Sequence, residues 1–271
     1  MRERLWWSVR NSNVARRLLA WPLLAGILRR VSYLLLPSST HKILQVRNGL
    51  GEGLWLELSP RWESHIWQGP YEPAVQQVVY DYFKPGKTVY DVGGGIGFYA
   101  LVAARLGAQV FTFEPDPKNF DCIERNARTN HLGGSFNLMR LAAFSRTGTL
   151  VMEPSDRRHG HGHAHAKEIW DSGVHESFEA ACTTLDDFAR ENPLPDLIKI
   201  DVEGCEAAVV KGAGLLMRDV RPAILCEVHD VELANEVETL VRSRGYKVAW
   251  LDDPDYPVRW IYATADAECR T

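Results

Sequence analysis

The chain lacks several features that would place it in a specialised class of protein. Its five cysteines are scattered without a C-x-x-C pair, so neither a disulfide framework nor a zinc knuckle is indicated, and a cytoplasmic location is expected. In the apolar N-terminal stretch the longest uncharged run is the eleven residues Leu18 to Leu28, which is too short to span a bilayer. No internal repeat is visible. The net charge of −4 gives no reason to expect a nucleic-acid partner.

The stretch from Thr88 to Asp116 has the pattern of a βαβ unit with a glycine-rich turn after its first strand. The first β-rich run ends at Asp91 and the second ends at Glu114, with a helical run between them. Glycines in such a turn let the backbone approach a ligand closely, and a carboxylate at the end of the second strand can accept both hydroxyls of a ribose. The residues predicted to bind a cofactor here are Asp91, Gly93, Gly95, Gly97, Glu114 and Pro115.

The spacing of these glycines excludes two common nucleotide sites. A dinucleotide-binding turn needs a third glycine where this chain has Phe98, and no P-loop lysine with a following Ser or Thr is present. A plain tight turn in an α/β protein remains the alternative. The G-x-G-x-G turn after an Asp-ended strand, with an acid ending the next strand, resembles motifs I and II of class I S-adenosylmethionine-dependent methyltransferases.

A second stretch, residues 183–230, narrows the resemblance. Its segments TLDDF, DLIKIDVEGCE, VVKGAGLLM and PAILCEVHD are similar to the C-terminal half of the FkbM-type methyltransferase family. The resemblance covers roughly residues 70–262. It implies a Rossmann-like class I methyltransferase, an α/β fold with a mostly parallel seven-stranded sheet flanked by helices. It also implies S-adenosylmethionine as cofactor and O-methylation, often of a sugar or a natural product.

The catalytic candidates follow from the order of the strands. In an open α/β sheet the site lies at the carboxyl ends of the strands, and the first, fourth and fifth strands are expected to be neighbours there. The fourth strand ends with Asp201 and Glu203, and the fifth ends with Glu227 and His229. We expect Asp201 to face the cofactor or the substrate and to act as the base, with Glu203 and His229 as the other catalytic candidates. Capping of the following helix is the alternative for both acids, and a structural role is the alternative for His229.

Three further assignments are weaker. Asp201, Glu227 and His229 could together hold a divalent cation such as Mg²⁺ or Mn²⁺, but no spacing demands it, so the sequence assigns no metal ligand. The family resemblance implies that Glu72 faces the cofactor; a first-turn acid complementing the helix dipole is the alternative. A third strand is expected over residues 136–143. The resemblance implies that Ala142, near the end of this strand, matches the position that lines the adenine, and a core position is the alternative there.

The N-terminal part is expected to be an extension, residues 1–70, that precedes a methyltransferase domain at residues 71–271. Residues 1–36 carry seven arginines and one glutamate. They could form a basic helix lying peripherally on an anionic membrane, or an arm that packs on its own domain or on a partner subunit of a homo-oligomer. A β-hairpin is expected over residues 43–58. The histidine-rich segment HGHGHAH, residues 159–165, is expected in a mobile lid, with metal binding as the alternative.

The predicted function is an O-methyltransferase that acts on a hydroxyl of a sugar, glycan or natural product. Two competing interpretations remain. A nucleotide-dependent oxidoreductase is disfavoured by Phe98 at the third glycine position. A non-catalytic membrane-surface adaptor with a vestigial cofactor site is disfavoured by the intact set Gly93, Gly95, Glu114 and Asp201.

Overall fold

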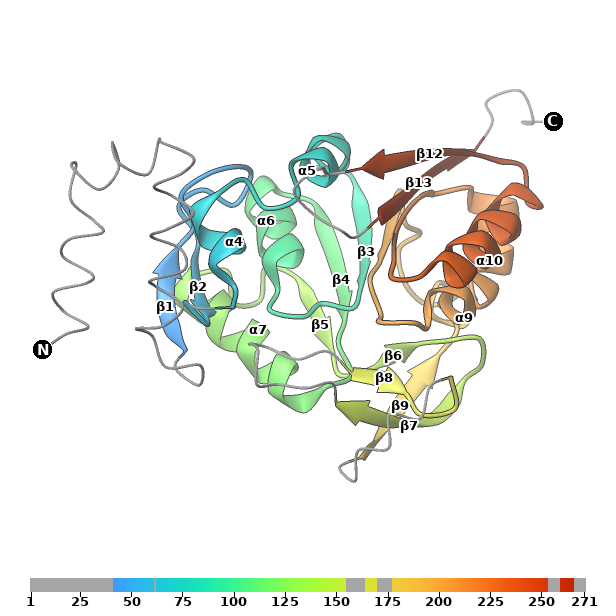
Figure 1. Cartoon of the computed structure of the whole chain (residues 1–271), viewed down its shortest axis with the longest axis horizontal. Coiled ribbons are helices and arrows are strands. Elements are labelled where there is room, and N and C mark those ends of the chain that lie inside the picture. The colour runs from blue at the N-terminus through green and yellow to red at the C-terminus, as the bar shows by residue number, and fades with distance from the viewer. Residues whose placement is uncertain (1–40, 61, 155–163, 170–176, 253–258, 266–271) are drawn as a thin grey trace, which may run out of the picture.

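The computed structural model describes residues 41–60, 62–154, 164–169, 177–252 and 259–265, which Figure 1 draws as coloured ribbon. The basic arm at residues 1–36 and histidines 159, 161 and 163 lie outside the described residues, so the predictions for them stay predictions. Within the described ranges, no helix has the length and the apolar character needed to cross a membrane.

A seven-stranded sheet forms the centre of the fold. Its strands are β3 (Thr88–Val92), β4 (Gln109–Phe113), β5 (Asn137–Met139), β10 (Leu197–Ile200), β11 (Ala223–Val228), β12 (Tyr246–Asp252) and β13 (Arg259–Ala265). The spatial order is β12-β13-β11-β10-β3-β4-β5. All neighbours from β11 to β5 are parallel, whereas β13 is antiparallel to both β11 and β12. The predicted mostly parallel sheet is therefore confirmed, and its first, fourth and fifth strands are neighbours as expected.

Helices cover both faces of this sheet (Figure 1). They are α4 (Ser64–Gln68), α5 (Pro73–Val79), α6 (Phe98–Leu106), α7 (Pro117–Thr129), α8 (Leu185–Phe188), α9 (Glu206–Lys211) and α10 (Val231–Arg242), with a π-helical turn at Leu216–Val220. Strands β3, β10 and β11 are buried along their whole length because each face lies beneath helices. One hydrophobic cluster includes residues of α5 and α6, a second includes residues of α9 and α10, and a third includes residues of a second, smaller sheet, such as Leu150 and Met152.

The predicted N-terminal hairpin is present as β1 (Lys42–Gln45) and β2 (Trp55–Leu58), which pair antiparallel. Leu56 is buried and Trp55 is exposed, so the alternation gives one core-facing side as expected. Two asparagines, one in α7 and one directly after its end, hold the edge of the hairpin. The side-chain oxygen of Asn130 accepts the N–H of Trp55 at 2.8 Å, and that of Asn126 accepts the N–H of Glu57 at 2.7 Å.

A second, four-stranded sheet lies against the carboxyl ends of β3, β4 and β10. It consists of β6 (Ala142–Ala143), β7 (Gly148–Pro154), β8 (Ala164–Ala166) and β9 (Phe178–Thr183), in the order β6-β9-β7-β8. The expected single strand over residues 136–143 is therefore wrong. The carbonyl of Met139 accepts the N–H of Glu114, which ends the pairing of β5 with the large sheet. The chain then turns, and β6 pairs with β9 instead.

The histidine-rich segment also differs from the expectation where it is described. Residues 164–166 form β8, which pairs antiparallel with β7 and places His165 opposite Glu153. Both side chains are buried, and Nε2 of His165 lies 3.7 Å from Oε2 of Glu153. The prediction of a mobile lid is therefore wrong for residues 164–166, which form a short strand paired with β7. Residues 155–163 and 170–176 lie outside the description.

Candidate active site

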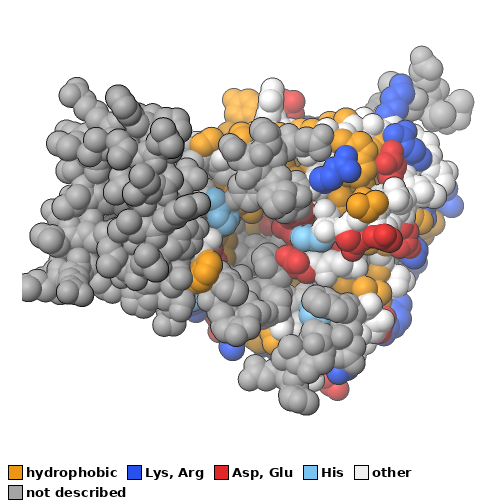
Figure 2. All heavy atoms as spheres, viewed as in Figure 1, with side chains coloured by type: hydrophobic (Ala, Val, Ile, Leu, Met, Phe, Trp, Pro, Cys, Tyr) orange, Lys and Arg blue, Asp and Glu red, His pale blue; other side chains and the backbone are white. Residues whose placement is uncertain are grey.

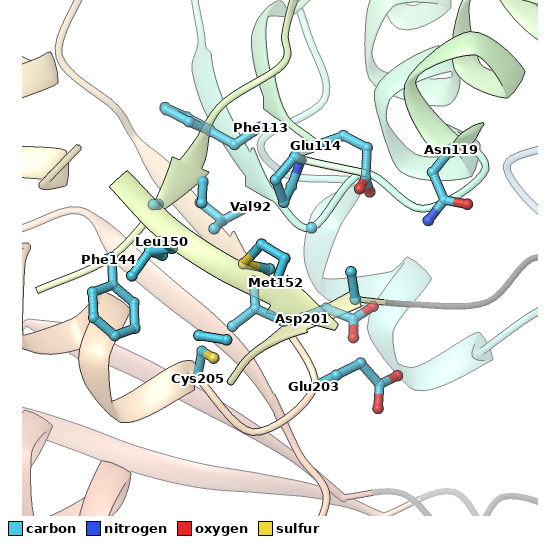
Figure 3. A pocket seen from close by; sticks show the side chains of 17 residues that line it. Val92, Phe113, Glu114, Asn119, Phe144, Leu150, Met152, Asp201, Glu203 and Cys205 are labelled. Carbon is cyan, nitrogen blue, oxygen red and sulfur yellow. The ribbon is translucent and has the colours of Figure 1, made fainter. Parts of the chain in front are cut away.

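A cavity open to solvent lies where the carboxyl ends of β3, β4 and β10 meet the four-stranded sheet, and the empty space in it and at its open side amounts to about 500 Å³. One part of its wall is apolar and comes from the small sheet and the segment before it, with Phe144, Leu150 and Met152. Figure 3 shows the carboxylates of Glu114, Asp201 and Glu203 on the other part, pointing toward the same open side. An apolar slot with a few polar groups at its edge is the usual form of a site for a small organic ligand.

The glycine turn is built so that β3 and β10 approach each other closely. Gly93 has φ +86°, and a Cβ on it would lie 1.7 Å from the backbone oxygen of Asp201. Only glycine fits that space and that backbone conformation. The turn therefore fixes the position of Asp201 relative to the end of the first strand.

Glu114 lies at the end of β4, as predicted, and lines the cavity. Its Oε2 accepts the N–H of Gly95 at 2.8 Å, and its Oε1 accepts the N–H of Asp116 at 2.9 Å. Burial outweighs these hydrogen bonds and raises the pKa of Glu114 to about 8. The carboxylate is thus held rigidly, and Asn119 lies beside it on the same wall (Figure 3).

Asp91 is a buried carboxylate whose oxygens accept no hydrogen bond from the described residues. The nearest cation is the Nζ of Lys199, at 3.6 Å. Burial raises the pKa of Asp91 to about 6, although the charge of Lys199 lowers it. Asp91 is not part of the cavity wall, so its contact with the cofactor stays a prediction. The apolar slot fits an adenine, and Glu114 fits a ribose, so the residues present suit this cofactor.

The structure divides the predicted cofactor residues into two groups. The cavity is lined by five of them, namely Gly93, Glu114, Pro115, Ala142 and Asp201. The predicted catalytic residue Glu203 also lines it. Asp91, Gly95, Gly97 and Glu72 do not form part of that wall. The backbone of Gly95 instead orients Glu114, and Gly97 begins α6.

Glu72 precedes α5 in a left-handed conformation, φ +46°, and makes no side-chain cap to the helix. Its Oε2 accepts a hydrogen bond of 2.6 Å from the hydroxyl of Tyr99. Burial raises the pKa of Glu72 to about 7, and the charge of Asp201 adds to that effect. The side chain therefore belongs to the buried charged cluster behind the cavity. Its contact with the cofactor stays a prediction.

Lys199 is the basic centre of this cluster. Its Nζ lies 3.3 Å from Oδ2 of Asp201, and the two residues share a face of β10 as expected. Burial lowers the pKa of Lys199, but the carboxylates of Asp201 and Asp91 outweigh burial and raise it above its usual value. The ammonium group also lies 5.2 Å from the ring centre of Tyr99. These contacts keep Lys199 charged beside Asp201.

The ends of β10 and β11 bring the remaining candidates together. Ile200 pairs with Cys226, so the residues that follow, Asp201 and Glu227, are adjacent. Burial and the neighbouring charge of Asp201 raise the pKa of Glu227 well above its usual value. Helix α9 has Cys205 as its N-cap without a side-chain cap, so capping by Asp201 or Glu203 is not observed.

His229 follows β11 and is partly exposed. Its Nδ1 lies 3.3 Å from Oε1 of Glu206, and its Nε2 lies 3.6 Å from Oε1 of Glu203. Burial lowers the pKa of His229, but the hydrogen bond to Glu206 and the charge of Glu203 outweigh it and raise the pKa to about 9. The imidazole is therefore mainly protonated at neutral pH in the cofactor-free protein.

Sequence reasoning missed most of the apolar wall and one polar residue of it. Leu150, Met152 and Ala166 lie in β7 and β8, two strands of the small sheet, which was not predicted from the sequence. Asn119 stands in the first turn of the helix after Glu114, and a polar residue there could have been found from the βαβ pattern alone.

Comparison with known proteins agrees with this geometry. The family described as "Methyltransferase FkbM domain" matches residues 91–248, which is more than half of the chain. The chain belongs to the FkbM methyltransferase family. The FkbM resemblance, the class I methyltransferase fold and S-adenosylmethionine as cofactor are thereby confirmed, and the oxidoreductase alternative is set aside.

Individual relatives within and around the FkbM family are distant. The hexuronic acid methyltransferase AglP of Haloferax volcanii is 28% identical over 52% of this chain, and the match spans 55% of that protein, about half its length. The 31-O-demethyl-FK506 methyltransferase FkbM of Streptomyces tacrolimicus is 27% identical over 67% of this chain and 81% of its own. A crystal structure of methyltransferase FkbM from Methylobacillus flagellatus covers 65% of this chain and 43% of its own, with 16% identity and a TM-score of 0.48.

Proposed function

We propose that this chain is an S-adenosylmethionine-dependent O-methyltransferase whose acceptor is a hydroxyl of a sugar, glycan or natural product. The observation that carries the proposal is the position of Asp201. This carboxylate lines the cofactor cavity, is held by Lys199 and lies among further carboxylates at the cavity mouth. A hydroxyl acceptor must lose its proton during transfer, and a carboxylate at that position can receive it.

The charge of the site favours a hydroxyl over an amine. Carboxyl groups outnumber basic groups in this cluster, which contains Glu203, Glu227 and Asp201 beside Lys199 and His229. A negative environment raises the pKa of an amine and keeps it as an unreactive ammonium ion. A hydroxyl is uncharged in the same environment and keeps its lone pairs available until Asp201 takes its proton during the transfer. The named activities of the relatives AglP and FkbM, on a hexuronic acid and on 31-O-demethyl-FK506, support an oxygen acceptor.

The residues of the chain supply positioning and proton transfer. S-adenosylmethionine brings a methyl group that is already activated on a sulfonium. Orientation of two reactants in one site can lower the barrier by about 7–11 kcal/mol. Asp201 is the proton acceptor in this proposal, because its side chain lines the cavity, whereas Glu227 and His229 are not part of the cavity wall. Glu203, which also lines the cavity, is the second carboxylate in reach of an acceptor.

A panel of acceptors tests the proposal. Glucuronides, neutral glycosides, a polyketide with free hydroxyls and a primary amine would be incubated with the full-length protein and S-adenosylmethionine. We expect release of S-adenosylhomocysteine with at least one hydroxyl acceptor and none with the amine. Turnover of the amine alone would contradict O-methylation. Calorimetry with NAD, for which no binding is expected, checks the cofactor assignment separately.

A further inference from the structure

We propose that Asp201, Glu227 and His229 form a binding site for a divalent cation, Mg²⁺ or Mn²⁺, at the mouth of the cofactor cavity. One ligand atom from each of the three side chains lies within 4.8 Å of the others. Ligands on opposite sides of one ion, with bonds of about 2.0–2.6 Å, are about 4–5 Å apart. Rotation of the three side chains would bring these atoms onto a single ion without movement of the strands.

The two strands that present these ligands are fixed by the sheet. Asp201 directly follows β10, and Glu227 lies in β11 at the neighbouring register position. His229 stands two residues after Glu227, so both side chains leave the chain on the same side where the backbone stays extended. A site on adjacent parallel strands is held by backbone hydrogen bonds, which limits the cost of ordering its ligands.

The orientation of His229 is an independent sign of a cation. Glu206 is fully buried, and its Oε1 lies 3.3 Å from Nδ1 of the imidazole. The other ring nitrogen, Nε2, therefore faces carboxylates, with Oε1 of Glu203 at 3.6 Å and Oε1 of Glu227 at 4.0 Å. Histidines that bind metals usually donate their second N–H to a carboxylate in this way, which leaves the first nitrogen for the metal.

The number of carboxyl groups around these three residues also favours a bound divalent cation. Oε2 of the buried Glu206 has no hydrogen-bond partner among the described residues. Acidic and histidine side chains gather near the middle of the face shown in Figure 2. The carboxyl groups of this region are more numerous than its basic groups, of which Lys199 is already engaged by Asp91 and Asp201. A bound divalent ion is the strongest local compensation for such an excess of negative charge.

The ligand set specifies the class of cation. Two carboxylates and one imidazole suit Mg²⁺ or Mn²⁺ more than a soft metal, and three protein ligands leave positions open in an octahedral shell. An acceptor hydroxyl in an open position would lose its proton more readily, because the ion lowers the hydroxyl pKa. In the cation-bound site Glu203 receives the proton that Asp201 receives without the ion. This use of the ion rests on the proposed function, whereas its binding does not.

Titration with MnCl₂ tests the site directly. Full-length protein, freed of metal with a chelator and dialysed, is titrated while electron paramagnetic resonance reports free Mn²⁺. We expect saturable binding at one site and displacement by MgCl₂. Glu227→Gln and His229→Ala should each weaken binding at least tenfold, a loss of about 1.4 kcal/mol or more. The control Glu236→Gln removes a carboxylate from an exposed pair with Lys211 and should bind as the unchanged protein does.

Two results would overturn the site. One is the absence of saturable Mn²⁺ binding at millimolar concentration, and the other is binding by both site variants that equals the control. Glu227 is buried, so Glu227→Gln could fail to fold, and the partly exposed His229 then decides the outcome through His229→Ala. Because Mn²⁺ binding is measured without methyl transfer, intact binding with no turnover on any acceptor would count against the proposed function and leave the cation site standing.

Discussion

The Nζ of Lys199 lies 3.3 Å from Oδ2 of Asp201, and the lysine side chain is only 3% exposed. The same nitrogen lies 3.6 Å from Asp91 at the end of the neighbouring strand. One ammonium group thus holds two carboxylates, that of Asp91 in β3 and that of Asp201 directly after β10. Loss of one member of such a buried group leaves the others without compensation.

Lys199→Met should therefore destabilise the protein far more than removal of an exposed lysine. We expect a loss of about 3–5 kcal/mol in the free energy of unfolding, because Asp91 stays buried and Asp201 partly buried without a cation. The control is Lys211→Met, whose exposed pair with Glu236 contributes about 0–1 kcal/mol. Urea unfolding of both variants measures the difference. Equal losses would show that Lys199 is not the centre of the buried cluster.

Gly93→Ala should disrupt the turn between β3 and α6. A methyl group there would overlap the backbone oxygen of Asp201, and the positive φ adds strain of about 1–3 kcal/mol. Gly133→Ala is the control, since no atom lies within 4 Å of the added Cβ and its φ is not in the left-handed region. We expect loss of S-adenosylmethionine binding and a lowered melting temperature for the first variant only. A Gly93→Ala protein with unchanged binding would refute this account of the turn.

Adenosine binding should depend on pH through Glu114. Burial raises the pKa of this carboxyl to about 8, and the ionised form is the one that accepts both ribose hydroxyls. At lower pH the carboxyl must first lose its proton, so affinity should fall by about tenfold for each pH unit below that pKa. Above it the affinity should be constant. Calorimetry with adenosine, which has no group titrating in this range, measures the profile.

The matched variant for that experiment is Glu114→Gln, which cannot ionise. Its affinity for adenosine should be weaker at high pH and independent of pH. If the unchanged protein shows the same flat profile between pH 6 and pH 9, the proton on Glu114 does not oppose ribose binding.

Asp201→Asn should separate chemistry from cofactor binding. The amide keeps the size of the side chain but cannot accept the acceptor's proton, so turnover should fall at least about a hundredfold. Affinity for S-adenosylmethionine should stay within a few-fold, because Glu114 and the apolar wall are untouched. Single-turnover kinetics and calorimetry provide the two numbers. Undiminished turnover would remove the proton-accepting role from Asp201.

The large sheet and its glycine turn were predictable because their signals are local. One βαβ unit contains the strand ending at Asp91, the glycines that follow it and the acid at position 114. The hydrophobic period of its strands and helix and the spacing of its glycines are therefore enough to predict it. The fourth and fifth strands are continuous apolar runs, which indicate burial on both faces, and neighbouring strand ends place Asp201 beside Glu227.

The small sheet was not predictable because its pairings are distant and its strands are short. Ala142 and Ala143 pair with Cys182 and Thr183, and nothing in a run of two alanines indicates a change of sheet. The same sheet supplies Met152 and Ala166 to the cavity, so this part of the cavity wall could not be predicted from the sequence. Glu72 shows a further limit, since its left-handed backbone conformation reflects tertiary contacts with Tyr99 and not its local residues.

The central claim is that the cavity between the strand ends and the small sheet binds S-adenosylmethionine. A crystal structure of the protein soaked with S-adenosylhomocysteine tests it most directly. We predict density in this cavity, with the ribose hydroxyls within hydrogen-bonding distance of Glu114 and the adenine against Leu150 and Met152. Density for the ligand at another place, or a cavity closed by its own side chains, would contradict the claim.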